Sequence, residues 1–321
     1  MLYEGFMRQL SPPDDPRWIL DAKRYYGPPD QNLKLLTHAL FAESRTDACI
    51  YHGIPLYGLF KDGGSPLWAG KKLREQFPGR VNLYGPCSPY EAGALDKLDR
   101  MVEEDGIIGI KLYPMDLIDG KIHAYRLDNP EIAYPLIERA RSHGIRHVAL
   151  HKALPLGPVP MDPFRPSDVD NAAIAFPDMT FEVVHGGFAF LEETAWLLAR
   201  FPNVVINLEG SSGYLCTRPR RFAELLGTFL SVGGADRIYW SVGCMALHPR
   251  PFIEAFWNMT MPADLVEDYG LPPVTREIKE KILGLNHARA LGLDVEAMRK
   301  VSTNDPLSKR KELAPPWSAP L

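Results

Sequence analysis

Seven short apolar runs recur along the chain, and a segment with helical spacing precedes each of them. The runs are centred near residues 48, 82, 109, 149, 183, 206 and 240. Strands that alternate with helices in this way form βαβ units, and such units build a parallel sheet covered by helices. The alternation therefore restricts the chain to the α/β class.

A closed (β/α)8 barrel needs eight strands, one more than these runs supply. No GxGxxG sequence follows the first run, so a dinucleotide-binding doubly wound sheet lacks its fingerprint. We predict a distorted (β/α)8 TIM barrel with an atypical or missing first strand. That strand either lies in the irregular N-terminal segment, where a helix is expected over Trp18 to Tyr26, or is absent from this chain. Residues 1–300 are expected to form one domain and residues 301–321 a Pro-rich tail.

Charge and composition set limits on the partners. The net charge of -4 and the pI near 6.2 offer no basic surface for nucleic acid or an anionic membrane. The N-terminal residues lack the pattern of a signal peptide, and no apolar run is long enough to span a bilayer. Four cysteines are scattered without CxxC spacing. We therefore expect a cytoplasmic protein that binds a small molecule.

Two of the apolar runs end in histidine, at His151 and at His185. Because all parallel strands point the same way, their C-terminal ends meet at one edge, where α/β barrels keep their chemistry. Neutral imidazole binds zinc, manganese or iron, and a catalytic site usually adds a carboxylate and an open water position. The pair either ligates a metal or consists of structural histidines that seal the barrel end.

Other polar side chains stand at or near strand ends. Glu209 is a candidate third metal ligand, with an arginine-paired rim glutamate as the alternative. Five more residues are candidates for lining a substrate pocket: His52, Lys111, Tyr113, Cys244 and His248. Lys111 could instead be a salt-bridged lysine, and His248 could cap the helix that it precedes. The pattern assigns no catalytic residue.

Several motifs follow one another in an order that resembles a known family. They are Gly-Ile-Lys111-Leu-Tyr113-Pro, the His151 strand, His185-Gly-Gly, Asp236-Arg-Ile-Tyr-Trp, His248-Pro-Arg-Pro and Asn286-His-Ala-Arg-Ala-Leu-Gly-Leu. With its motifs in this order, the chain resembles the amidohydrolase-2 branch of the amidohydrolase superfamily. That branch contains decarboxylases of the aminocarboxymuconate-semialdehyde type. The resemblance spans about residues 45 to 295.

The resemblance implies a distorted TIM barrel with a divalent metal, most often zinc, with iron or manganese as alternatives, or a vacant site. Family members hold the metal with a His-x-His pair, two later histidines and a final aspartate. His151 and His185 match the later two histidines. No His-x-His occurs in this sequence, and Gly243 stands at the aspartate position. Glycine has no side chain with which to ligate a metal.

Two functions follow from this incomplete match. In the first, the chain is a divergent enzyme that hydrolyses or decarboxylates a small carboxylate-bearing substrate, as one subunit of a hetero-oligomer or with itself. In the second, it is a degenerate partner subunit that supports a metal-complete homologue, for example in a dinuclear-metal monooxygenase.

Overall fold

The computed structural model describes residue 10 and residues 28–244, 247–305 and 307. The described residues form two compact units, each treated by itself: Cys49–Asn207, called the sheet unit, and the described remainder, called the terminal unit. The helix expected over Trp18 to Tyr26 and most of the expected tail lie outside the described residues. One domain over residues 1–300 stays a prediction.

The sheet unit contains six parallel strands, which are hydrogen-bonded in the order β1-β2-β3-β6-β7-β8. Their bounds are β1 Cys49–His52, β2 Val81–Cys87, β3 Gly109–Leu112, β6 His147–His151, β7 Thr180–Val184 and β8 Val204–Asn207. All six were predicted from the apolar runs. The seventh predicted strand is β9 (Ile238–Tyr239), which belongs to the terminal unit.

Strand register sorts the side chains of the sheet onto two faces. Lys111 pairs with Ala149, and Ala149 pairs with Glu182, so these three side chains share one face. Because successive strand residues alternate, the other residues can be assigned from this row. The polar face carries His52, Tyr84, Lys111, His147, His151, Glu182 and Asn207. The apolar face carries Leu83, Ile110, Val148, Phe181 and Val204.

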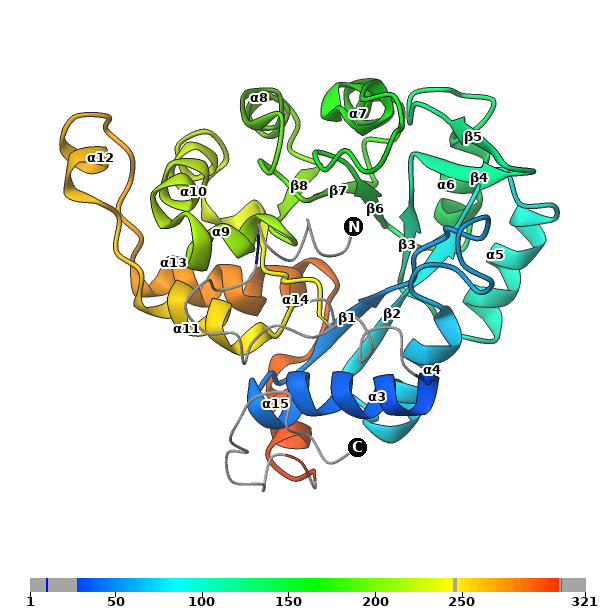
Figure 1. Cartoon of the computed structure of the whole chain (residues 1–321), viewed down its shortest axis with the longest axis horizontal. Coiled ribbons are helices and arrows are strands. Elements are labelled where there is room, and N and C mark those ends of the chain that lie inside the picture. The colour runs from blue at the N-terminus through cyan, green and yellow to red at the C-terminus, as the bar shows by residue number, and fades with distance from the viewer. Residues whose placement is uncertain (1–9, 11–27, 245–246, 306, 308–321) are drawn as a thin grey trace. The chain divides into compact units, whose positions relative to one another are not determined.

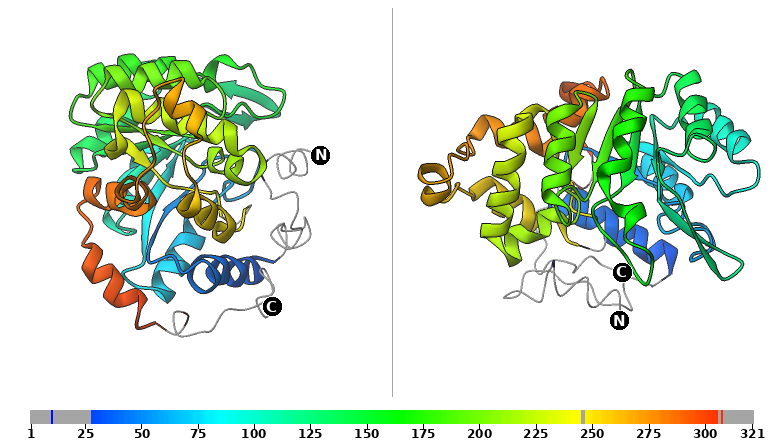
Figure 2. Two further views of the ribbon diagram at one scale, coloured as in Figure 1. Left: turned by 90° about the vertical axis from the view of Figure 1, so that its left-hand side faces the viewer. Right: turned by 90° about the horizontal axis from the view of Figure 1, so that it is seen from above.

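Helices of the sheet unit pack on the apolar face. A Cβ added to Gly70 in α4 would lie 2.6 Å from Tyr51 and 2.9 Å from Leu83, so α4 needs glycine there to approach the sheet. Figure 1 shows α5 to α8 on one side of the strands, and Figure 2 shows the green helices α7 and α8 from two further directions. The helix bounds are α4 Leu67–Gln76, α5 Ala94–Glu103, α6 Tyr134–Ser142, α7 Val169–Ala175 and α8 Leu191–Arg200, with short 3-10 turns η3 Asp162–Phe164 and η4 Pro166–Asp168.

An antiparallel hairpin that the sequence analysis missed follows β3. Its strands are β4 (Met115–Ile118) and β5 (Lys121–Ala124). Asp119 and Gly120 connect them with φ values of 50° and 73°. Two positive φ values at an Asp-Gly pair are typical of a type I′ turn, and this dipeptide was the available signal.

The terminal unit is mainly helical. Its elements are α3 Pro29–Thr37, η2 His38–Glu43, η5 Ser211–Gly213, α9 Tyr214–Thr217, α10 Pro219–Gly233, η6 Ala235–Arg237, β9, α11 Pro249–Asn258, α12 Ala263–Glu267, α13 Arg276–Glu280, η7 Lys281–Leu285, α14 Asn286–Ala290 and α15 Val295–Ser302. Residues Arg276 to Ala290 form three consecutive helical pieces, α13, η7 and α14. Thr275 caps the first piece, accepting a hydrogen bond from the backbone N–H of Ile278. None of the helices formed by described residues combines the length and apolar character needed to cross a bilayer.

Candidate active site on the polar face

A buried carboxylate, Glu182, lies on the polar face in the middle of β7. Asn207 Nδ2 donates a hydrogen bond to Glu182 Oε1 at 2.5 Å, and His52 Nε2 lies 3.8 Å from the same oxygen. Burial raises the pKa of Glu182 to about 7, while the Asn207 hydrogen bond and the positive charge of Lys111 act in the opposite direction. Glu182 can therefore hold or release a proton near neutral pH. Glu182, Asn207, His52, Tyr84 and Lys111 are called the Glu182 cluster.

His52 is the member of this cluster that reaches the surface. Its side chain is 18% exposed, whereas that of Glu182 is fully buried. Its ring stacks on the ring of Tyr84 with centroids 4.7 Å apart and an interplanar angle of 8°. The stacking and the nearby carboxylate hold the imidazole in one orientation at the C-terminal end of β1.

The two histidines singled out from the sequence contact each other. His185 Nε2 lies 2.8 Å from His151 Nδ1, and His151 Nε2 lies 2.8 Å from the carbonyl oxygen of Leu154. A carbonyl only accepts hydrogen bonds, so His151 Nε2 carries a proton. Burial first, and then the charges of His185 and Lys111, hold the pKa of His151 well below its usual range. The neutral ring of His151 therefore accepts a hydrogen bond from His185 at Nδ1.

His185 reaches this contact through a left-handed backbone. Its φ is 67°, which few residues other than glycine adopt. The residue directly follows β7, so an extended backbone would turn its side chain away from the polar face. On the other side of the pair, Tyr113 stacks on His151 with centroids 4.0 Å apart. The contact between the two rings therefore comes with local backbone strain at His185.

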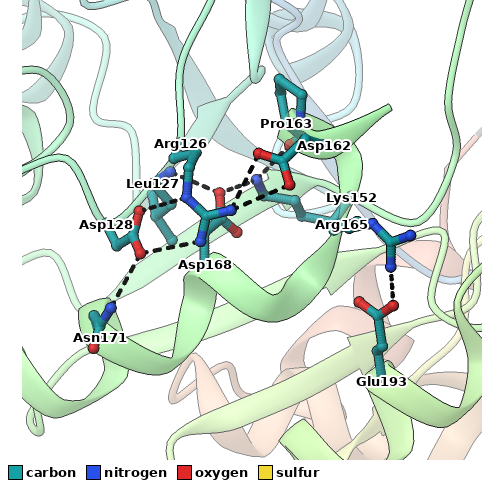
Figure 3. Close-up of polar contacts among 10 residues, drawn as sticks. All are labelled: Arg126, Leu127, Asp128, Lys152, Asp162, Pro163, Arg165, Asp168, Asn171 and Glu193. Atoms are coloured by element: carbon teal, nitrogen blue, oxygen red, sulfur yellow. Dashed lines mark hydrogen bonds and ion pairs between the residues drawn. The ribbon is translucent and has the colours of Figure 1, made fainter. Parts of the chain in front are cut away.

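A buried ion pair anchors the loop that follows β6. Lys152 Nζ lies 2.5 Å from Asp168 Oδ2 and donates to the carbonyl of Pro163 at 2.6 Å, and the backbone N–H of Leu127 donates to the same carboxylate oxygen (Figure 3). Burial lowers the pKa of Lys152 and raises that of Asp168, and their mutual attraction opposes both shifts. The loop also supplies Leu154, so the pair holds the carbonyl that orients His151.

Arg126 adds an outer layer to this network. Its guanidinium bonds to both carboxylate oxygens of Asp128 and to Asp162 (Figure 3). Asn171 in turn donates to Asp128 at 3.0 Å. These contacts join the segment after the hairpin to the start of α7. The network is structural support around the histidine pair, because its members bond to one another and to backbone.

Glu209 belongs to the terminal unit, where it lies against Gly243. A Cβ added to Gly243 would stand 2.0 Å from Glu209 Oε1, and Gly243 has a φ of 68°. The carboxylate of Glu209 therefore occupies the space into which a side chain at 243 would extend. It stands beside the position where the resemblance places an aspartate.

His248 also belongs to the terminal unit. It is fully buried, its Nε2 lies 2.7 Å from Glu43 Oε2, and its Nδ1 accepts from the backbone N–H of Arg250. Burial lowers the pKa of His248, and the hydrogen bond with Glu43 opposes the shift. His248 thus caps α11. Cys244 lies next to Gly243 in the same unit and is partly exposed.

The structure brings together five of the residues selected from the sequence. His52, Lys111, Tyr113, His151 and His185 all lie in the sheet unit, in or beside the polar face. Sequence reasoning missed Glu182 and Asn207. A single charged residue inside the apolar run Thr180–Val184 was the available signal, because such a residue is tolerated in a buried strand only with a partner.

The described residues do not fit a divalent metal as they stand. No group of three or more His, Cys, Asp or Glu side chains among them is arranged to hold an ion. Both ring nitrogens of His151 are already engaged. Ligation by His151, His185 and Glu209 stays a prediction of the resemblance, and no chemical step below depends on it.

A parallel α/β sheet with helices on one face and titratable side chains on the other is the architecture of TIM-barrel folds. The amidohydrolase family model matches residues 62–293. This chain therefore belongs to the amidohydrolase family, as its motifs predicted. Among curated proteins, none matches the sequence significantly.

Solved structures show the same fold at low identity. An uncharacterized TIM-barrel protein from Bordetella bronchiseptica is 19% identical, with a TM-score of 0.65 over 90% of this chain and 89% of that one. A 2,6-dihydroxybenzoate decarboxylase from Rhizobium is 17% identical, with a TM-score of 0.50 over 70% and 74%. A dihydroxybenzoic acid decarboxylase from a Polaromonas species, with bound manganese and 2-nitroresorcinol, is 16% identical, with a TM-score of 0.51 over 73% and 76%. The predicted distorted TIM barrel is confirmed.

Proposed function

We propose that this chain is an amidohydrolase-family enzyme that hydrolyses or decarboxylates a small carboxylate-bearing substrate at the polar face of the sheet unit. Family membership supports the reaction class. Two proteins of similar fold are decarboxylases of dihydroxybenzoates, which are therefore the first substrates to test.

The observation that carries the proposal is a buried cation on the polar face. Lys111 is 2% exposed, and its charge lowers the pKa of both Glu182 and His151. The residue between Lys111 and Glu182 in the strand register is Ala149, whose side chain is small. A positive charge in a site of low dielectric attracts a carboxylate far more strongly than it would in water.

The experiment is a turnover assay on purified chain with benzoates that carry hydroxyl groups beside the carboxylate, and with simple amides and lactones. Release of CO2 or of hydrolysis product is measured with and without added manganese. We expect turnover of at least one carboxylate, and a loss of about 10- to 100-fold in kcat/KM for Lys111→Met, the range for one hydrogen bond to a charged group.

Lys121→Met in β5 is the matched control, because Lys121 is an exposed lysine of the same unit. Its kcat/KM should equal that of the wild type. The proposal fails if no carboxylate is turned over under any condition, or if the two lysine variants behave alike.

The incomplete set of metal-binding side chains favours a second candidate, a non-catalytic subunit. No metal-binding group of three is present among the described residues, and a stable fold does not require one. This candidate requires a stable complex with a homologous subunit that carries His-x-His and the final aspartate. Co-purification followed by mass measurement tests it, and a chain that turns over substrate as a monomer or homo-oligomer refutes it.

A further inference from the structure

His52 and Glu182 face each other across the polar face although they belong to distant strands. His52 ends β1, Glu182 lies in β7, and three strands stand between them in the sheet. Their closest polar atoms, Nε2 and Oε1, are 3.8 Å apart. This distance is longer than a hydrogen bond, but catalytic pairs often tighten only when substrate is bound.

Glu182 is held in place from neighbouring strands. Asn207 of β8 donates to Oε1, and Lys111 of β3 supplies positive charge on the same face. The carboxylate is fully buried, whereas the side chain of His52 is 18% exposed, so His52 is the more accessible member of the pair. Glu182 is therefore suited to act on a neighbouring group instead of on substrate.

His52 is suited to be that neighbouring group. Its side chain is 18% exposed at the C-terminal end of β1, and its ring stacks on that of Tyr84. Tyr84 also lies near His147, with ring centroids 6.5 Å apart. A partly exposed imidazole that is backed by a buried carboxylate is an arrangement by which histidine transfers protons in many enzymes.

We propose that His52 and Glu182 form a proton-transfer dyad, in which His52 exchanges a proton with the substrate and Glu182 positions the imidazole. The proposal rests on the proposed function and identifies the residue that donates the proton in the reaction. In a decarboxylation, the bond from the substrate carbon to its carboxylate breaks, CO2 leaves, and the electron pair stays on the carbon. That carbon takes a proton from the His52 imidazolium, and water returns a proton to His52, leaving a hydroxide ion that combines with the released CO2 as bicarbonate. His52 is then a catalytic residue and Glu182 a positioning residue.

The kinetic test uses His52→Gln and Glu182→Gln in the full chain, with His123→Gln and Glu138→Gln as matched controls at exposed positions of the sheet unit. Removal of a general acid costs about 100- to 10,000-fold in kcat, which is expected for His52→Gln. Glu182→Gln should lower kcat and move the pH profile of kcat/KM to lower pH. If His52→Gln does not fold, as judged by circular dichroism, His52→Asn replaces it.

A second readout needs no turnover. The imidazole signals of His52 are followed by NMR as a function of pH in the wild type and in Glu182→Gln. Once ionised, the Glu182 carboxylate favours the charged imidazole. The upper part of the His52 titration curve should therefore move to lower pH in the variant, and the curve of His123 should not move. Lys111, Asn207 and Tyr84 also face this pair and are unchanged in the variant.

These readouts separate the dyad from the proposed function. An unchanged His52 titration curve in Glu182→Gln overturns the dyad whatever the activity. Wild-type turnover that His52→Gln retains also overturns it. A titration curve that shifts in Glu182→Gln, for a wild-type protein that turns over no carboxylate, supports the coupled pair and rejects the proposed function.

Discussion

His52 Nε2 and Glu182 Oε1 lie 3.8 Å apart, although strands β2, β3 and β6 separate their two strands in the sheet. Neighbouring strands are about 4.8 Å apart, so four spacings in a flat sheet would separate these strands by roughly 19 Å. The contact therefore requires strong curvature toward the polar face. That curvature concentrates the titratable side chains of several strands into one site.

Glu182 should make stability depend on pH. Its pKa in the folded chain is raised from 4.5 to about 7, so the folded state binds its proton more tightly than the unfolded state. This contribution is fully present below about pH 4.5 and is lost as pH rises through 7, with a total of about 3 kcal/mol. Urea unfolding from pH 4.5 to 8 should show this decrease in the free energy of unfolding in the wild type. The decrease should be smaller in Glu182→Gln and unchanged in Glu138→Gln. Parallel curves for wild type and Glu182→Gln would contradict the raised pKa.

The histidine pair predicts the metal content of the chain. Because His151 already uses both ring nitrogens, we expect purified protein to carry well under one equivalent of zinc, iron or manganese. The double variant His151→Asn with His185→Asn should change this value little while lowering thermal stability. Metal content is measured by plasma mass spectrometry. One equivalent in the wild type that disappears in the double variant and in Glu209→Gln would instead support ligation by these three residues.

Replacing only one member of the Lys152–Asp168 pair should destabilise the protein more than replacing both. Replacing one partner of a buried ion pair leaves an uncompensated charge, so Lys152→Met should lower the free energy of unfolding by about 3 to 5 kcal/mol. The double variant Lys152→Met with Asp168→Leu should lose less than the single variant. Arg141→Met, which breaks an exposed pair with Asp178, is the control and should cost under about 1 kcal/mol. Equal losses in Lys152→Met and Arg141→Met would contradict the expected cost of leaving Asp168 buried without its partner.

Gly243 and Glu209 should behave as a coupled pair. Gly243→Ala places a Cβ in contact with the Glu209 carboxylate and a side chain at a φ of 68°, which should cost about 1 to 3 kcal/mol from backbone strain, in addition to the clash. In the double variant Gly243→Ala with Glu209→Ala, the clash is removed, so the Gly243→Ala change should cost only the backbone strain. A double-mutant cycle by urea unfolding should show a coupling of about 0.5 to 3 kcal/mol. Strictly additive losses would mean that the two side chains do not compete for space.

Much of the fold could be predicted because its signals are local. All seven predicted strands are present, and helix α4 precedes β2 as the helical spacing before that run predicted. The hairpin at Asp119-Gly120 was missed although its turn dipeptide is visible in the sequence. By contrast, the recurrence of histidine at strand ends was enough to place His151 and His185 at one edge of the sheet.

The sequence by itself determined the strands, their parallel direction and therefore the shared edge of the histidine pair, because hydrophobic periodicity and the βαβ pattern act over short stretches of chain. Only the tertiary structure decided that Glu182 meets His52, that His151 bonds to His185 instead of standing open, and that Glu209 takes the space beside Gly243. These relationships depend on the curvature of the sheet, on a left-handed backbone at His185 and on side-chain packing between residues distant in the sequence. No local pattern of residues encodes them.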